Sequence, residues 1–102
     1  MMRAYTKDEV REKFLDYVRG FASYWTAQPN LTDRRKCYGV AFSILALLDG
    51  VHMEFPSVDI AVHPHEDDME YHKSNGENWY EPGVVFNDDC DLHEMFYKDS
   101  DR

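Results

Sequence analysis

Residues 37–50 read CYGVAFSILALLDG, and this stretch decides the fold of the chain. A helix drawn through it carries apolar side chains on nearly every face, so it must be buried on most sides. We expect the helix to begin at Thr32 or Asp33. It should end at Asp49-Gly50, where glycine suits the left-handed position after a helix. In a small domain such a helix is either the central element or is partly covered by a second subunit, so a homodimer is one expectation.

A second long helix is predicted before it. Thr6 and Glu9 fit a capping box, and an apolar stripe at helical spacing then runs to about Ala27. The stripe consists of Val10, Phe14, Val18, Phe21 and Trp25. Gly20 lies inside this helix at a cost of roughly 1 kcal/mol relative to Ala, which the close packing of a neighbour would explain. Gly39 would allow a close crossing of the two helices.

The periodicity changes after residue 50. Apolar residues at alternate positions of 58–62 predict a half-buried strand, which Pro64 ends. The pair Pro82-Gly83 is a type II turn signal. It separates the short runs 79–81 and 84–86, which predict a hairpin or a sheet edge. The second half of the chain is therefore expected to contribute a small sheet.

Two short helices complete the expected order of elements. One covers about 65–73, with carboxylates at its start and Lys73 at its end, as the helix dipole prefers. The other begins after Asp89, which can cap it. We therefore predict an α+β fold in a single compact domain over residues 1–102. Two long N-terminal helices would pack on a small antiparallel sheet, with short acidic helices at the rim.

Charge is concentrated in the second half of the chain. Residues 1–50 carry eight Lys/Arg and six Asp/Glu, whereas residues 51–102 carry three and fourteen, a net charge of -11. Such a surface repels phosphate backbones, so no direct nucleic-acid binding is expected. The longest apolar run is twelve residues, too short for a bilayer, so no membrane partner is expected. The lone cysteines Cys37 and Cys90 favour a reducing, cytoplasmic location.

The acidic half is predicted to bind another protein. Trp79 and Tyr80 lie in a turn-rich segment among carboxylates, and aromatic side chains are common anchors of interfaces. The carboxylates would steer a partner with a basic surface. The residues that we expect at this interface are Asp67, Asp68, Glu70, Trp79, Tyr80, Asp88 and Asp89. On this interpretation the chain is a small acidic interaction module. Its size and charge fit an accessory or inhibitory protein of bacterial or phage origin.

The alternative is a metal-binding protein or a metal-dependent hydrolase. His65, Asp68 and His72 share one face of the expected helix, and His63 ends the strand before it. Imidazoles with a carboxylate can hold zinc or another divalent transition metal. The same pattern is also typical of a solvated acidic helix, because His beside Asp or Glu is common in this composition.

No catalytic residue is predicted. Cys90 and His93 lie near the start of the last helix, but the neighbouring carboxylates disfavour a thiolate. The sequence contains no nucleophile-elbow, phosphate-loop or dinucleotide-binding motif. We therefore expect a protein that is not an enzyme and needs no cofactor, unless the histidine cluster holds its metal.

Overall fold

The computed structural model describes residues 2–98, and its first element is helix α1, Lys7–Thr26. Thr6 caps this helix. The Thr6 hydroxyl accepts the backbone N–H of Glu9 at 3.2 Å, and the Glu9 carboxylate accepts the backbone N–H of Thr6 at 2.9 Å. This reciprocal pair confirms the predicted capping box.

Helix α2, Asp33–Leu48, follows a loop over 27–32 that contains Asn30 in the left-handed region at φ 64°. The Thr32 hydroxyl accepts the backbone N–H of Arg35, so Thr32 is the N-cap. Asp49 is the C-cap, and Gly50 at φ 82° turns the chain away from the helix axis. Both ends of the central helix are thus confirmed.

The two long helices cross at Gly39. A Cβ atom on Gly39 would lie 2.5 Å from Cε2 of Trp25, so only glycine lets the indole ring rest on α2 at this point. The ring also donates its Nε1–H to the Ser43 hydroxyl at 3.0 Å. The close crossing predicted at Gly39 is therefore confirmed. Around Gly20, in contrast, nothing lies within 4 Å of an added Cβ, so the expected neighbour is not there.

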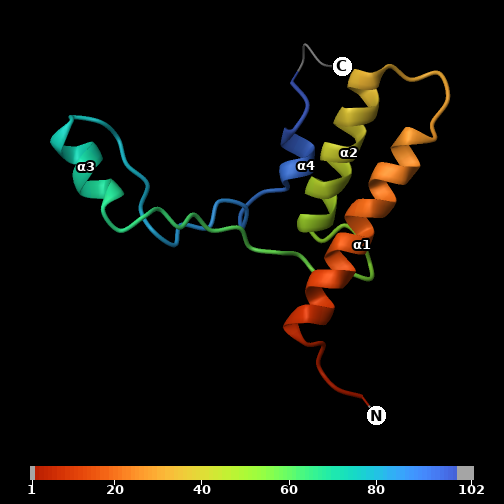
Figure 1. The fold of residues 1–102 in the computed structure, drawn as a ribbon, viewed down its shortest axis with the longest axis horizontal. Helices are drawn as coiled ribbons and strands as arrows, with labels where there is room; N and C mark the ends of the chain where they lie inside the picture. Colours follow the sequence, from red (N-terminus) through yellow and green to blue (C-terminus); the bar gives the residue numbers. More distant parts are fainter. Residues whose placement is uncertain (1, 99–102) are drawn as a thin grey trace.

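A small apolar core lies at the base of this helical hairpin. Leu47 is 2% exposed, and Phe55, from the loop after α2, is 6% exposed. The ring of Phe14 on α1 meets Phe55 edge-on, with 5.9 Å between ring centroids. Helix α4, Leu92–Met95, lies along the other side of α2 (Figure 1), where His93 packs edge-on against Phe42. These elements form the helical body.

Residues 58–87 leave the body as an arm with helix α3, Asp68–Ser74, at its far end (Figure 1). Its outgoing and returning segments run antiparallel beside each other. Val62 donates its backbone N–H to Val84, and Phe86 donates to Ile60, both at 3.1 Å. The arm is attached at its base by a bond from the backbone N–H of Val58 to the Leu48 carbonyl, 2.8 Å long.

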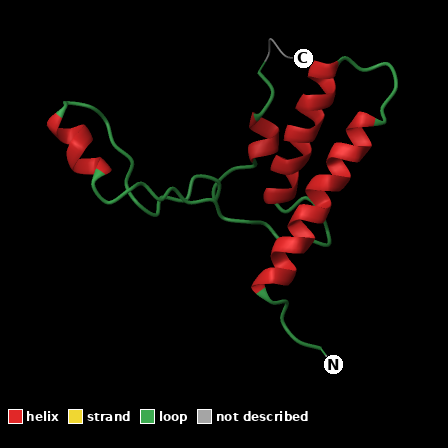
Figure 2. Cartoon of the chain, in the orientation of Figure 1, coloured by secondary structure: helices red, strands yellow, loops and turns green. Residues whose placement is uncertain are grey.

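The predicted antiparallel sheet is wrong. Within the described residues the structure is helical, without a strand or sheet, and pairing along the arm amounts to one isolated bridge between Ala61 and Val85 (Figure 2). At its base the Asn87 side chain replaces the backbone as a partner: Oδ1 accepts the N–H of Ile60, and Nδ2 donates to the Val58 carbonyl. The pairing is too short and has no third segment, so no ladder develops.

The described short helices differ from the expected rim in two further respects. Helix α3 begins at Asp68 and not at residue 65, so His65 lies outside the helix and the predicted shared helix face of His65, Asp68 and His72 is wrong. The last helix takes Asp91 as its N-cap, not Asp89, and no cap bond comes from the Asp91 side chain. The first backbone N–H groups of α4 are instead met by Asp49, from the end of α2. A cap supplied by a residue 44 positions away is invisible to local sequence patterns.

The chain exposes much surface for its size. Its radius of gyration is 17.7 Å, against about 13 Å for a compact chain of this length. Its accessible surface is 8390 Å², whereas a compact monomer of 12.1 kDa exposes about 6,000 Å². The surplus is about 2,400 Å². The arm, which projects from the helical body beyond its base, accounts for this open shape (Figure 1).

Candidate functional sites: the acidic arm and an Asp–His cluster

The arm carries a dense negative charge. Residues 58–87 contain seven Asp/Glu and one Lys, a net charge of -6 with histidines neutral. The carboxylates of Asp67, Asp68 and Glu70 are exposed around α3 at the far end of the arm. No other helix packs on α3 in the described structure, so these side chains face solvent.

Aromatic side chains are exposed on the same arm. Trp79 is 40% exposed and Tyr80 is 71% exposed. The indole is held in place, because its Nε1–H donates to Glu81 at 2.9 Å and the Lys73 ammonium lies over the ring at 4.5 Å. A large apolar ring fixed in position among carboxylates is the kind of anchor that interfaces use.

The residues predicted to bind a partner thus lie along one projecting element. Asp67, Asp68, Glu70, Trp79 and Tyr80 belong to the arm itself. Asp88 and Asp89 are exposed where the arm rejoins the body. Their role in binding stays a prediction.

The residues predicted to hold a metal also lie on the arm. His63 and Asp68 line one pocket of about 290 Å³ together with Tyr80. Nδ1 of His65 accepts the backbone N–H of Asp67 at 3.2 Å, and Nδ1 of His72 lies 3.7 Å from Glu77 Oε1. Within residues 2–98, the side-chain ligand atoms of His63, His65, Asp68 and His72 do not come close enough together to form a candidate metal site. The histidine site stays a prediction.

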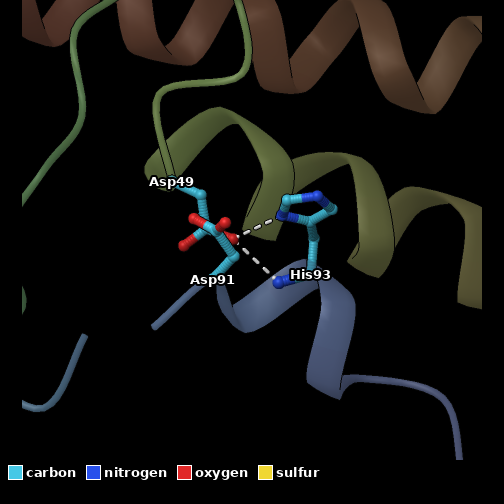
Figure 3. Close-up of side chains that lie close together, drawn as sticks. All are labelled: Asp49, Asp91 and His93. Atoms are coloured by element: carbon cyan, nitrogen blue, oxygen red, sulfur yellow. Dashed lines mark hydrogen bonds and ion pairs between the residues drawn. The ribbon is translucent and has the colours of Figure 1, made fainter. Parts of the chain in front are cut away.

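The ligand atoms that do converge belong to Asp49, Asp91 and His93, which lie within 4.8 Å of one another (Figure 3). Asp49 comes from the end of α2, and the other two come from the start of α4. Oδ2 of Asp49 accepts two hydrogen bonds from His93, one from the backbone N–H at 2.8 Å and one from ring Nδ1 at 2.6 Å. The Asp49 side chain is fully buried, and the His93 side chain is 16% exposed.

The second oxygen of Asp49 has no such partner. Its Oδ1 is buried and accepts no hydrogen bond. Burial by itself raises the pKa of Asp49. The hydrogen bonds from His93, together with the backbone amide of Leu92, outweigh burial and hold the pKa below its ordinary value. Asp49 is therefore a carboxylate at neutral pH, with one oxygen satisfied twice and the other bare.

A polar pocket of about 180 Å³ adjoins this cluster. Four carboxylates line it, those of Asp49, Asp59, Asp88 and Asp91, and no Lys or Arg of the described chain does. Cys90 also lines it. Burial raises the pKa of the Cys90 thiol, and the neighbouring carboxylates raise it further. The thiol is thus protonated at neutral pH, which does not suit a nucleophile.

Sequence reasoning missed Asp49 as a site residue, although it noted His93 and Cys90 among neighbouring carboxylates. One signal was present: the C-terminal end of a helix disfavours an acidic side chain, and Asp49 stands there. A residue that breaks a local rule is often placed for another purpose. Its partner, His93, was beyond reach because it lies 44 positions along the chain.

Comparisons with protein-family models, with curated proteins and with solved structures find no match to this chain. None of the described helices combines the length and apolar character needed to cross a membrane. Function is therefore inferred from the arrangement of the residues themselves.

Proposed function

We propose that this chain is a small acidic interaction module that binds a partner protein with a basic surface through its arm. The observation that carries the proposal is the arm itself. Residues 58–87 project from the helical body, carry a net charge of -6 and expose Trp79 and Tyr80. Charge of one sign steers a partner of the other, and fixed aromatic rings supply the apolar contact.

The surplus surface supports this proposal. Beyond its base the arm projects away from the long helices, so holding it in one geometry costs conformational entropy that few contacts with the body offset. The surplus of about 2,400 Å² exceeds the roughly 800 Å² that one partner buries in a standard protein interface, so the exposed surface has room for one. A partner seated along the arm would provide the missing burial. The two free cysteines, Cys37 and Cys90, suit a cytoplasmic setting for such a complex.

The test is a comparison of two charge-matched variants. In the arm variant Asp67→Asn, Asp68→Asn and Glu70→Gln remove three charges around α3. In the control variant Asp8→Asn, Glu12→Gln and Asp16→Asn remove three exposed charges from α1. Wild-type chain and both variants are immobilised, and proteins retained from cell extract are quantified at low and high salt.

The proposal expects a basic protein that wild type and the control variant retain equally and that the arm variant loses. Retention should also fall with salt. Replacing Trp79 and Tyr80 by Ala should abolish retention at unchanged charge, which non-specific attraction to a polyanion would not do. Equal retention by the arm variant and wild type would refute the proposal.

A second copy of the chain is the competing occupant of the exposed surface. Light scattering separates the two cases, because the monomer has a mass of 12.1 kDa. A dimer that persists in the arm variant would assign the surplus surface to contacts between the helical bodies.

A further inference from the structure

The two oxygens of the buried Asp49 carboxylate differ in their hydrogen bonds. The two hydrogen bonds from His93, from its backbone N–H and its ring Nδ1, both end on Oδ2. Oδ1 is also buried, yet no hydrogen bond reaches it. Burying a charged oxygen without a partner is costly, and native proteins seldom leave one in that state. This oxygen is therefore the place where an added ligand would be stabilised.

The charges around Oδ1 specify the sign of that ligand. The Asp91 carboxylate lies within 4.8 Å of the Asp49 carboxylate, and like charges at that range repel. Asp59 and Asp88 line the same pocket, and no Lys or Arg among the described residues does. One imidazole, that of His93, is the only basic group in the cluster. An added positive charge would satisfy Oδ1 and neutralise the repulsion together.

We propose that a divalent cation binds between Asp49 Oδ1 and the Asp91 carboxylate, at the mouth of this polar pocket. Oxygen atoms of the pocket and water complete its coordination. The donors are carboxylates, which are the ligands of hard cations such as Ca²⁺, Mg²⁺ and Mn²⁺. The site is separate from the histidines of the arm and from the carboxylates around α3, although Asp88 of its pocket is also among the residues predicted to bind a partner.

His93 is a positioning residue in this site and not a ligand. Its ring Nδ1 is already engaged with Asp49 Oδ2 at 2.6 Å. Metal-binding carboxylates are commonly held by such an outer hydrogen bond, which fixes the orientation of the free oxygen. Here the two hydrogen bonds from His93 to Oδ2 fix the Asp49 carboxylate, and the Asp91 carboxylate lies within 4.8 Å of it.

The cation would join three parts of the fold. Asp49 is the C-cap of α2 and Asp91 is the N-cap of α4 (Figure 3). Asp59 and Asp88, near the two ends of the arm in the sequence, line the adjoining pocket. Binding at this junction would therefore stabilise the whole chain and hold the base of the arm to the helical body.

The experiment uses the full chain, stripped with EDTA and then titrated separately with Ca²⁺, Mg²⁺, Mn²⁺ and Zn²⁺. Thermal melts and calorimetry report binding. We expect one site per chain for at least one of the three hard cations. At a hundredfold excess over Kd the midpoint of the melt should rise by about 10 °C or more, and EDTA should reverse the rise.

Three variants identify the ligands. Asp91→Asn should weaken cation binding at least tenfold, and without cation it should melt no lower than wild type because a repulsive charge is gone. Asp89→Asn removes an equal charge from an exposed neighbour outside the pocket and should bind as wild type does. His93→Asn keeps a donor near the position of Nδ1 and should retain most of the affinity, whereas His93→Ala should not.

Three results would overturn the proposal. The first is the absence of a 1:1 response to any of the hard cations at millimolar concentration. The second is equal weakening by Asp91→Asn and Asp89→Asn, which would show diffuse attraction to an acidic surface. The third is a response to Zn²⁺ alone that His93→Asn abolishes, which would make the imidazole a ligand.

Discussion

The crossing of α1 and α2 predicts that one substitution has opposite effects at two glycines. Gly→Ala inside a helix ordinarily stabilises by about 1 kcal/mol. At Gly20 nothing lies within 4 Å of the new methyl group, so this gain should appear in full. At Gly39 the methyl group would lie 2.5 Å from Cε2 of Trp25, where ordinary carbon contacts are about 3.5–4.0 Å.

The magnitude at Gly39 follows from what must move. The Trp25 ring has to withdraw by about 1 Å, and such overpacking costs about 1–3 kcal/mol. Withdrawal also weakens the bond from Trp25 Nε1 to the Ser43 hydroxyl, worth about 0.5–1.5 kcal/mol. After the helix gain is subtracted, Gly39→Ala should destabilise by about 0.5–3.5 kcal/mol.

Thermal melts followed by circular dichroism measure both effects. For a domain of this size 1 kcal/mol shifts the midpoint by about 4–8 °C. Gly20→Ala should therefore raise the midpoint by several degrees, and Gly39→Ala should lower it by more. In a Trp25→Leu background the cost of Gly39→Ala should shrink, because the two sites are coupled. A Gly39→Ala variant as stable as Gly20→Ala, or the same cost in both backgrounds, would refute the packing argument.

Three further predictions concern charge, the arm and the thiol. The bond from Arg3 and the Thr6 backbone lower the pKa of Glu9 from 4.5 to about 2, so its charge stabilises α1 above about pH 4.5 and loses this effect as the pH falls toward 2. The stability difference between wild type and Glu9→Gln, followed by thermal melts, should accordingly vanish near pH 2; a difference that does not depend on pH would contradict it. Asn87→Ala removes both side-chain bonds at the base of the arm and should cost about 1–3 kcal/mol. Amide exchange at Ile60 should accelerate, and unchanged protection there would contradict the role of Asn87. In a Cys37→Ser background Cys90 should react with iodoacetamide at neutral pH more slowly than a free model thiol, because its pKa is raised; an equal or faster rate would count against that environment.

The limits of sequence reasoning are clearest in the arm. Alternating apolar residues in 58–62 describe which side chains share a face, but a strand also needs backbone partners along its length. The returning segment supplies only a short pairing, and Asn87 takes the place of a backbone partner at the base. Nothing in the local pattern distinguishes this arm from a sheet, so the predicted sheet was wrong.

The helices were determined by the sequence itself, because their signals act over three or four residues. The first helix starts at the capping box of Thr6 and Glu9, and the second starts at the N-cap Thr32. Gly50, at positive φ, turns the chain away after the second helix. All of these residues lie where the sequence predicted them. The Asp49–His93 pair needed the tertiary structure. Its members lie 44 positions apart, and their meeting depends on how α4 returns to α2 after the arm. Interactions that close so long a loop leave no periodic trace in the sequence, so only the folded chain shows that a buried carboxylate oxygen stands there without a partner.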